Sequence, residues 1–584
     1  MTKRDSAGQL TPGGCGLRNC EGNATPGCGT IHQPVLRLAT SNRFAGIPRR
    51  NAAVMLLSAG ALVAVTETVF PTIYGSTVPP LWAVQLPVGL FVVGVALGVA
   101  DRFWRLPWQR PSFAIVLAFF GCLAAGLLGG VSWPNSGDEY SYVFLTDTLL
   151  SGRFWVAAPP DPELFSAFHV SVHDGRTFSP YPPAWSALLV PFRALGALWL
   201  ANPLLTVLLG VALAGSCCRL GLGPAVRRPA LALVLLTPFT FFLGGSLFPQ
   251  TMAAALVASI VWAQLADEAR PHPWGKLLIG ALFGILLLTR YDVVAVVALV
   301  YAIDRLAMRR FAAIPDGLLL ILGTLPFVAC LAVYNAGVTG NPFQLTISWA
   351  GPVALGAPDA DAGTGLLMLR AAVFNVFWAG ALAQFGGLPV AVLAVAAFVL
   401  KIRRRTCRFY DFLFPAALVF YAFMPFTGGH QYGPRYWFWA WPLSILTIAT
   451  GLITEAGDIH SAVRRIGFEA FASACLVYAA GAFCVLLVTT HAYIEARRAV
   501  FDAPLPQARA IVLIPDRQLT MWWWQIAPIP ALSLDFTRNG IDFSAPVLYG
   551  RADLPDAFQR ACRQEGRDVF QWEPPGRMVQ VVCP

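Results

Sequence analysis

The segment SFAIVLAFFGCLAAGLLGGV, residues 112–131, is an almost unbroken apolar run, and SWPNSGDEYSYVFLTDTLLSG, residues 132–152, follows it directly. An α-helix of that length spans the hydrocarbon core of a bilayer, which is about 30 Å thick. Two adjacent carboxylates, Asp138 and Glu139, stand just after the apolar run ends. The sequence therefore places an acidic pair at the end of a predicted membrane span.

Similar apolar segments recur along most of the chain. Hydrophobic residues make up 57% of its 584 residues and charged residues only 12%, whereas a soluble globular protein has about 25% charged residues. We therefore predict an all-α polytopic membrane protein with about 13 transmembrane helices. The predicted spans are 52–73, 81–100, 111–132, 198–217, 229–246, 249–266, 275–290, 291–307, 314–336, 382–400, 411–427, 437–454 and 470–490. Residues 182–199 are expected to enter from the outer interface and run into the next span, with a separate helix as the alternative.

The charge distribution predicts the topology. Much of the net charge of +10 comes from residues 1–50 and from short basic connectors between the predicted spans. Basic connectors stay on the cytoplasmic side of a membrane. With the N-terminus inside, every basic connector falls inside, and the segments near 133–181 and 337–381, the turn 427–437 and everything after residue 490 fall outside. The charge therefore reflects topology, and no nucleic-acid partner is predicted.

Three regions follow from this topology. Residues 1–50 are expected to be a disordered, basic cytoplasmic segment, and residues 51–490 form the transmembrane domain. Residues 491–584 are interpreted as a small extracytoplasmic α/β domain, with strands in ARAIVLIP, APVLYGR, DVFQWEP and MVQVVC and a helix in LPDAFQRACRQEG. Trp522–Trp524 in that region either line a cleft or anchor the chain at the headgroups. Cys562 and Cys583 either pair there as a disulfide or stay apart.

The acidic pair has two explanations. Ser136 and Glu139 form the S-x-x-E pattern of a capping box, and Asp138 complements the dipole of an interfacial helix that ends at Gly152. Alternatively, a carboxylate next to apolar surroundings has a raised pKa and serves as a general base. We predict Asp138 and Glu139 as the catalytic residues. Asp138 is the expected base, and Glu139 is the more easily explained as structural.

Other polar side chains fall on the same predicted side of the membrane as the acids. The residues that we predict to bind substrate are His173 and Tyr181 in FHVSVHDGRTFSPYPPAW, Arg290 in LLLTRYDVV, and His430, Arg435 and Tyr436 in GGHQYGPRYW; His169 lies in the first of these segments as well. A base beside arginines suits group transfer from a phosphate leaving group, because arginine neutralises the phosphate. The ordinary alternatives are an arginine that reaches lipid headgroups, plain loop histidines and a solvated turn.

A metal site is a further alternative for the acidic pair, since carboxylates suit Mg²⁺ or Mn²⁺. Adjacent side chains on a helix diverge, however, and the sequence offers no obvious third ligand. It also has no P-loop, H-E-x-x-H or G-x-S-x-G motif. We therefore predict no metal and no other cofactor, with a divalent cation as the less favoured possibility.

Several motifs occur in a characteristic order. A span followed by GDEYSY precedes a long loop that ends in YPPAWSALLVP, and LTRYD, the YN…TGNPF segment of residues 334–343 and GPRYWFWAWP come later. Together with the small C-terminal domain, this order resembles the GT-C membrane glycosyltransferases over about residues 111–584. The likeness is greatest to bacterial relatives of the protein O-mannosyltransferases and of the lipid A aminoarabinose transferase.

The resemblance implies an enzyme that takes a sugar from a polyprenyl-phosphate donor, without a metal, on the outer face of the membrane. It implies Asp138 as base, Tyr181 and the two following prolines at the start of the next helix, and Arg290 as a contact of the donor phosphate. Two features depart from the family: Ala184 stands where glycine is usual, and two spans precede the usual first one.

We therefore predict a hexosyl or pentosyl transferase in the bacterial inner (plasma) membrane, with its active site facing the periplasm. It would transfer a sugar, with inversion, to an envelope acceptor that is a lipid, a glycan or a protein. One alternative is a transporter or flippase of a lipid-linked substrate, which predicts internal repeats and charges near the bilayer midplane. We find no repeat, and the charges cluster at the outer boundary. Another alternative is a non-catalytic envelope protein that binds glycan through its C-terminal domain.

Overall fold

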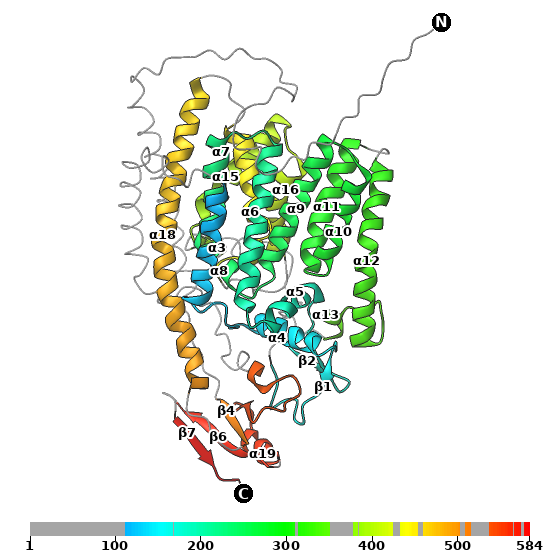
Figure 1. The fold of residues 1–584 in the computed structure, drawn as a ribbon, viewed down its shortest axis with the longest axis vertical. Coiled ribbons are helices and arrows are strands. Elements are labelled where there is room, and N and C mark those ends of the chain that lie inside the picture. The colour runs from blue at the N-terminus through cyan, green and yellow to red at the C-terminus, as the bar shows by residue number, and fades with distance from the viewer. Residues whose placement is uncertain are drawn as a thin grey trace. The chain divides into compact units, whose positions relative to one another are not determined.

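The computed structural model describes residues 111–167, 169–309, 313–350, 378–382, 385–423, 432–453, 459–502, 509–514, 536–564, 566–573 and 577–583. The predicted segment 1–50 and the predicted spans 52–73 and 81–100 lie outside these residues, as do His430 and Trp522–Trp524. The described part of the chain is mostly helical (Figure 1).

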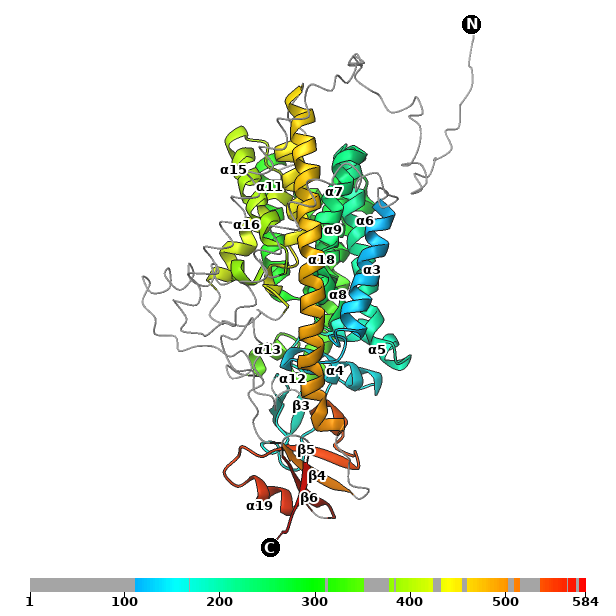
Figure 2. The same ribbon diagram turned by 90° about the vertical axis from the view of Figure 1, so that its left-hand side faces the viewer.

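Helices that run side by side form the main body of the described residues (Figure 1). These helices are α3 (Pro111–Leu127), α6 (Ala201–Arg219), α7 (Pro224–Leu235), α8 (Pro238–Gly245), α9 (Gln250–Ala269), α10 (Pro273–Leu287), α11 (Tyr291–Arg309), α12 (Ala313–Thr339), α15 (Leu388–Arg404), α16 (Phe409–Ala422), α17 (Ser444–Ile448) and α18 (Ile459–Asp502). Helix α10 packs against both α9 and α12. Helix α18 runs alongside α7 and α8 (Figure 2). Leu318, Ile321 and Leu325 on α12 are exposed, as expected of a helix that faces lipid tails.

Four described helices are long and apolar enough to cross a membrane: Leu198–Arg219, Gln250–Ala269, Ile314–Thr339 and Phe471–Glu495. The pair Val226–Leu235 and Pro238–Gly245 counts as a fifth if it is one span, bent by 54°. Four shorter apolar helices, Ser112–Leu127, Pro273–Leu287, Phe409–Ala422 and Trp441–Leu452, accompany them. The number of about 13 spans therefore stays a prediction.

Two of the predicted spans are broken in the structure. Residues 229–246 fall on α7 and α8, which Pro238 separates because a residue before proline avoids the helical region; Thr237 is extended, with φ −117° and ψ 151°. Residues 437–454 fall on short helical pieces, η8 (Trp441–Leu443), α17 and the π-helical turn η9 (Ala449–Ile453). Residues 182–199 contain a separate helix, α5 (Pro183–Ala194), which ends before Gly196, whose φ is +67°.

Helix α4 (Gly137–Leu150) follows α3 and packs against α5. Beyond it lies a small antiparallel sheet of β1 (Val156–Ala157), β2 (Ser171–His173) and β3 (Arg176–Phe178), in the order β1-β3-β2. The β2–β3 hairpin turns at Asp174 and Gly175, whose φ values of 48° and 71° are both positive. An Asp-Gly pair is favoured at such a turn because glycine and aspartate tolerate positive φ.

The last part of the chain forms a four-stranded sheet. Its strands β4 (Ala510–Ile514), β5 (Val547–Arg551), β6 (Asp568–Glu573) and β7 (Arg577–Val581) have the order β5-β4-β6-β7. Strand β4 pairs in parallel with β5 and β6, and β7 pairs antiparallel with β6. Strands β4, β5 and β6 and helix α19 (Ala557–Cys562) lie within the segments that the sequence predicts for them, and β7 begins one residue before its predicted segment. Cys562 and Cys583 form a disulfide.

The sheet packs on the loop that follows α4. Leu164 and Phe165 of that loop are buried against Ile511 and Leu513 of β4. An ion pair of 2.9 Å joins Arg153, just after α4, to Asp542. The C-terminal sheet therefore lies on the same side of the helices as the acidic pair.

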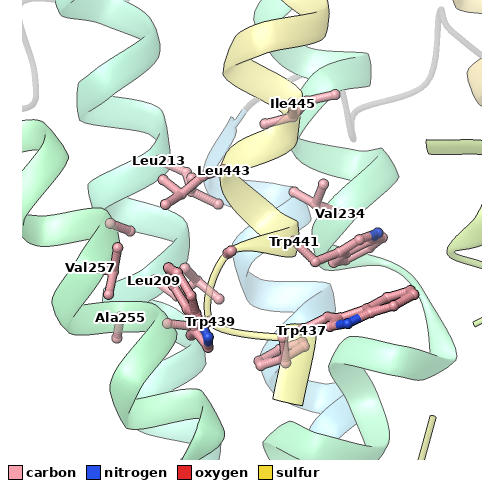
Figure 3. Close-up of a cluster of buried hydrophobic side chains, with 14 of the residues drawn as sticks. Leu209, Leu213, Val234, Ala255, Val257, Trp437, Trp439, Trp441, Leu443 and Ile445 are labelled. Atoms are coloured by element: carbon pink, nitrogen blue, oxygen red, sulfur yellow. The ribbon is translucent and has the colours of Figure 1, made fainter. Parts of the chain in front are cut away.

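A tryptophan-rich segment fills the core between the helices. Trp437, Trp439 and Trp441 are buried and lie among side chains of α6, α7 and α9 (Figure 3). In a membrane protein, close packing between side chains holds the helices together, because lipid tails are as apolar as the protein core. This packing fixes the backbone of η7 (Arg435–Trp437), which carries Arg435 and Tyr436.

Candidate active site

Helix α4 begins with the predicted cap. Ser136 is its N-cap residue, with an extended backbone, and its hydroxyl accepts the Glu139 N–H at 3.2 Å. The same hydroxyl donates to Oε2 of Glu139 at 3.1 Å. The serine half of the predicted capping box is therefore confirmed. The Glu139 carboxylate accepts the backbone N–H of Asn135, the residue before the N-cap. The cap fixes the position of Asp138 in the first turn.

Glu139 is fully buried, and its contacts are with the protein itself. Its carboxylate accepts the backbone N–H of Leu247, in the turn between α8 and α9, at 3.0 Å, and that of Asn135 at 3.1 Å. Burial raises the pKa of Glu139 to about 7, against the opposing effect of these hydrogen bonds. Glu139 therefore fastens α4 to the α8–α9 turn, which makes it a positioning residue for its neighbour Asp138.

Three side chains from distant parts of the chain surround the Asp138 carboxylate. Arg435 donates from Nη2 to Oδ2 at 2.7 Å. The Tyr181 hydroxyl donates to Oδ1, and Nε2 of His169 lies 3.9 Å from the same oxygen. Burial raises the pKa of Asp138, but Arg435, His169 and Tyr181 together outweigh it and hold the pKa well below its ordinary value. The sequence-based expectation of a raised pKa is therefore wrong for Asp138, because it did not include these partners.

Arg435 is buried, with 6% of its surface exposed. Its guanidinium lies 4.3 Å from the centre of the Phe248 ring and 5.5 Å from that of Tyr436. Among the described residues, its Nε and Nη1 atoms have no hydrogen-bond partner. Arg435 therefore stacks on aromatic rings and retains donors that an anion can accept.

A second acid–arginine pair, Asp292 and Arg290, lies beside the ring of Tyr436. Arg290 donates to both oxygens of Asp292, from Nε at 3.0 Å and from Nη2 at 2.5 Å, and its guanidinium lies 5.0 Å from the Tyr436 ring centre. The Tyr421 hydroxyl donates to Asp292 at 2.7 Å. Asp292 is not among the predicted site residues, although it is the last residue of the LTRYD motif. Asp292 accepts two hydrogen bonds from Arg290, the arginine that the sequence predicts to bind the donor phosphate.

The structure brings most of the predicted site residues together. Asp138, Tyr181, Arg435, Tyr436 and Arg290 form one connected group through the contacts above. The ring of Tyr181 also lies 4.7 Å from that of Tyr142 on α4.

The two histidines of the outer loop differ in position. His169, with a positive φ of 61°, lies against Asp138. His173 contacts Asp174 at 3.7 Å and the Trp349 ring at 4.6 Å, and its side chain is 48% exposed. Of the two histidines, His169 is the one that lies beside the acid. The substrate-binding role of His173 stays a prediction. The positive φ of a bulky residue carries strain, which is common at functional sites.

The described residues include no group of three or more His, Cys, Asp and Glu side chains that could hold a metal ion. The carboxylates of Asp138 and Glu139 have different partners, as expected of adjacent residues on a helix. The site offers instead a carboxylate for proton transfer and an arginine with unused donors for an anion.

No protein-family model and no curated protein sequence matches the chain. Among solved structures, the chain is similar to ArnT from Cupriavidus metallidurans bound to undecaprenyl phosphate, with 12% identity, a TM-score of 0.48 and coverage of 79% of this chain and 92% of that one. It is also similar to the oligosaccharyltransferase AglB from Archaeoglobus fulgidus in complex with an inhibitory peptide and a dolichol-phosphate, with 10% identity, a TM-score of 0.45 and coverage of 82% and 74%. Both belong to the GT-C class that the sequence motifs resemble.

Proposed function

We propose that the protein is an inverting membrane glycosyltransferase that moves a sugar from a polyprenyl-phosphate donor to an acceptor in the cell envelope. The observation that carries this proposal is the largely shielded contact of 2.7 Å between Asp138 and Arg435. It joins a proton acceptor to a cation whose Nε and Nη1 donors have no hydrogen-bond partner in the described part of the chain. Transfer from a sugar phosphate needs both groups within one small space.

In the proposed reaction, Asp138 takes the proton of an acceptor hydroxyl or amine while that group attacks the anomeric carbon of the sugar. The bond between this carbon and the phosphate oxygen breaks, and the lipid phosphate leaves with the electron pair. Arg435 stabilises the negative charge on the leaving phosphate. A single displacement of this kind inverts the anomeric configuration. Tyr181 holds Oδ1 of Asp138 and so orients the base.

Arg435 is a better candidate than Arg290 for the phosphate contact. Asp292 neutralises Arg290 through two hydrogen bonds, whereas Arg435 makes a single hydrogen bond to Asp138. A phosphate gains more from an arginine whose donors are unpaired, because buried donors without partners are costly. In this proposal Arg290 stays paired with Asp292 and supports Tyr436.

The proposal places the site on the outer face of the bacterial inner membrane. The disulfide between Cys562 and Cys583 supports this side, because disulfides persist in oxidising compartments. The sheet that carries Cys562 packs on the loop after α4, next to the proposed base. The positive connectors predict the same orientation.

Sugar transfer is tested with the purified full-length protein, labelled undecaprenyl-phosphate sugars and an envelope extract as acceptor. Enzyme-dependent appearance of the label on the acceptor, with inverted anomeric configuration by NMR, is the expected result. The same protein in proteoliposomes tests the alternative. If the label stays on the carrier and the carrier instead crosses the bilayer, the protein is a flippase and the proposal is wrong.

A further inference from the structure

We propose that the ion pair between Asp138 and Arg435 is a latch that the donor phosphate opens. The phosphate takes the Arg435 guanidinium away from Asp138, and the carboxylate becomes available as a base only after the donor has bound. This inference rests on the proposed function and adds an order of events to it: the donor binds before the acceptor is activated.

The carboxylate is occupied in the structure. Oδ2 of Asp138 accepts from Arg435 at 2.7 Å, and Oδ1 has Tyr181 and His169 beside it. The Asp138 side chain is only 16% exposed, and an ion pair that is largely shielded from solvent is stronger than one in water. An acceptor hydroxyl therefore competes with Arg435 for Oδ2 of Asp138. The competition ends when Arg435 binds the donor phosphate instead.

Arg435 is suited to change partner. Its Nε and Nη1 atoms have no hydrogen-bond partner within the described ranges, although the side chain is 94% buried, being 6% exposed. Phosphate oxygens accept two parallel N–H groups of one guanidinium, which is the strongest geometry available to arginine. A phosphate thus satisfies donors that Asp138 leaves unused, and this gain offsets the loss of the ion pair.

The neighbouring pair of Arg290 and Asp292 is bonded more extensively than the pair of Arg435 and Asp138. Arg290 gives Nε and Nη2 to Asp292, and Tyr421 holds that carboxylate from its other side. Asp138, by contrast, retains Tyr181 and His169 on Oδ1 when Arg435 leaves, so the base stays in place while the guanidinium moves. Of these two arginines, only Arg435 combines a single bond to its acid with unpaired donors.

The test measures the affinity of the purified full-length protein for undecaprenyl phosphate. The latch predicts that Asp138→Asn binds this lipid about tenfold more tightly than wild type or better, because the competing carboxylate charge is gone. Arg435→Gln is expected to bind it at least about tenfold more weakly. Asp147→Asn is the matched control, since Asp147 lies on the same helix and pairs with Arg193 at 2.6 Å; its affinity is expected to equal that of wild type.

The outcomes separate the latch from the function on which it rests. If wild type binds undecaprenyl phosphate and Asp138→Asn binds it equally or less tightly, the latch is wrong while the proposed function stands. If wild type does not bind the lipid at all, both are overturned. A melting temperature of Asp138→Asn within the range of the Asp147→Asn control shows that both variants are folded.

Discussion

Glu139 makes the stability of the protein depend on pH in a defined direction. Burial raises its pKa from the ordinary 4.5 to about 7, so the folded state favours the neutral form. The stability that Glu139 contributes is then fully present below pH 4.5 and is lost as the pH rises through 7. A shift of this size corresponds to about 3 kcal/mol in the free energy of unfolding.

Glu139→Gln removes the ionisation and keeps an oxygen for the Leu247 N–H. We expect the free energy of unfolding of wild type to fall by about 3 kcal/mol relative to this variant between pH 4.5 and pH 8. Denaturant unfolding of both proteins in the same detergent measures the difference, in which the contributions of the groups that both proteins share cancel.

Glu163→Gln serves as the control, because the Glu163 side chain is 67% exposed. Its stability should follow that of wild type across the same pH range. A constant difference between wild type and Glu139→Gln from pH 4.5 to pH 8 would refute the assignment of Glu139 as a buried group with a raised pKa.

Two more changes test a hydrogen bond of the site and a buried ion pair between α15 and α16. Tyr181→Phe removes the hydroxyl that holds Oδ1 of Asp138, and kcat for sugar transfer should fall by about tenfold or more, with the melting temperature unchanged; an unchanged kcat would exclude the orienting role of Tyr181. Lys401→Met leaves Asp411, whose side chain is 0% exposed, without its ion-pair partner at 2.8 Å, and should lower the free energy of unfolding by about 3–5 kcal/mol. The double change Lys401→Met with Asp411→Leu should recover most of that loss, and failure to do so would show that the lost free energy comes from packing.

Local patterns in the sequence predicted much of the local structure. The S-x-x-E pattern and Gly152 bracket α4, which runs from Gly137 to Leu150. The alternation and turn residues of the C-terminal region located β4 to β7 within a residue or two of their ends. These features depend on neighbours along the chain, and a sequence displays such neighbours directly.

Pairings across the chain could not be read in the same way. Arg435 lies 297 residues after Asp138, and the predicted topology put both on one side of the membrane without pairing them. The predicted direction of the pKa shift of Asp138 was therefore wrong. The position of His169 beside Asp138 depends on the backbone of one loop, which residue type and spacing do not reveal.

The breaks in the predicted spans also depend on tertiary structure. Pro238 is a visible signal for a break, but proline occurs inside membrane helices as well. Residues 437–454 are apolar enough to suggest one straight helix, whereas the structure divides them so that three tryptophans pack between helices (Figure 3). Hydropathy measures how well a segment tolerates an apolar environment, and it does not distinguish lipid from a protein core.

The central claim is that Asp138 is the base for sugar transfer, and the rate of transfer by Asp138→Asn tests it most directly. The assay compares initial rates from a labelled undecaprenyl-phosphate sugar for wild type, Asp138→Asn and the control Asp147→Asn. We predict that Asp138→Asn is slower by about 10²–10⁴-fold and that Asp147→Asn has the wild-type rate. Transfer by Asp138→Asn at the wild-type rate would contradict the account.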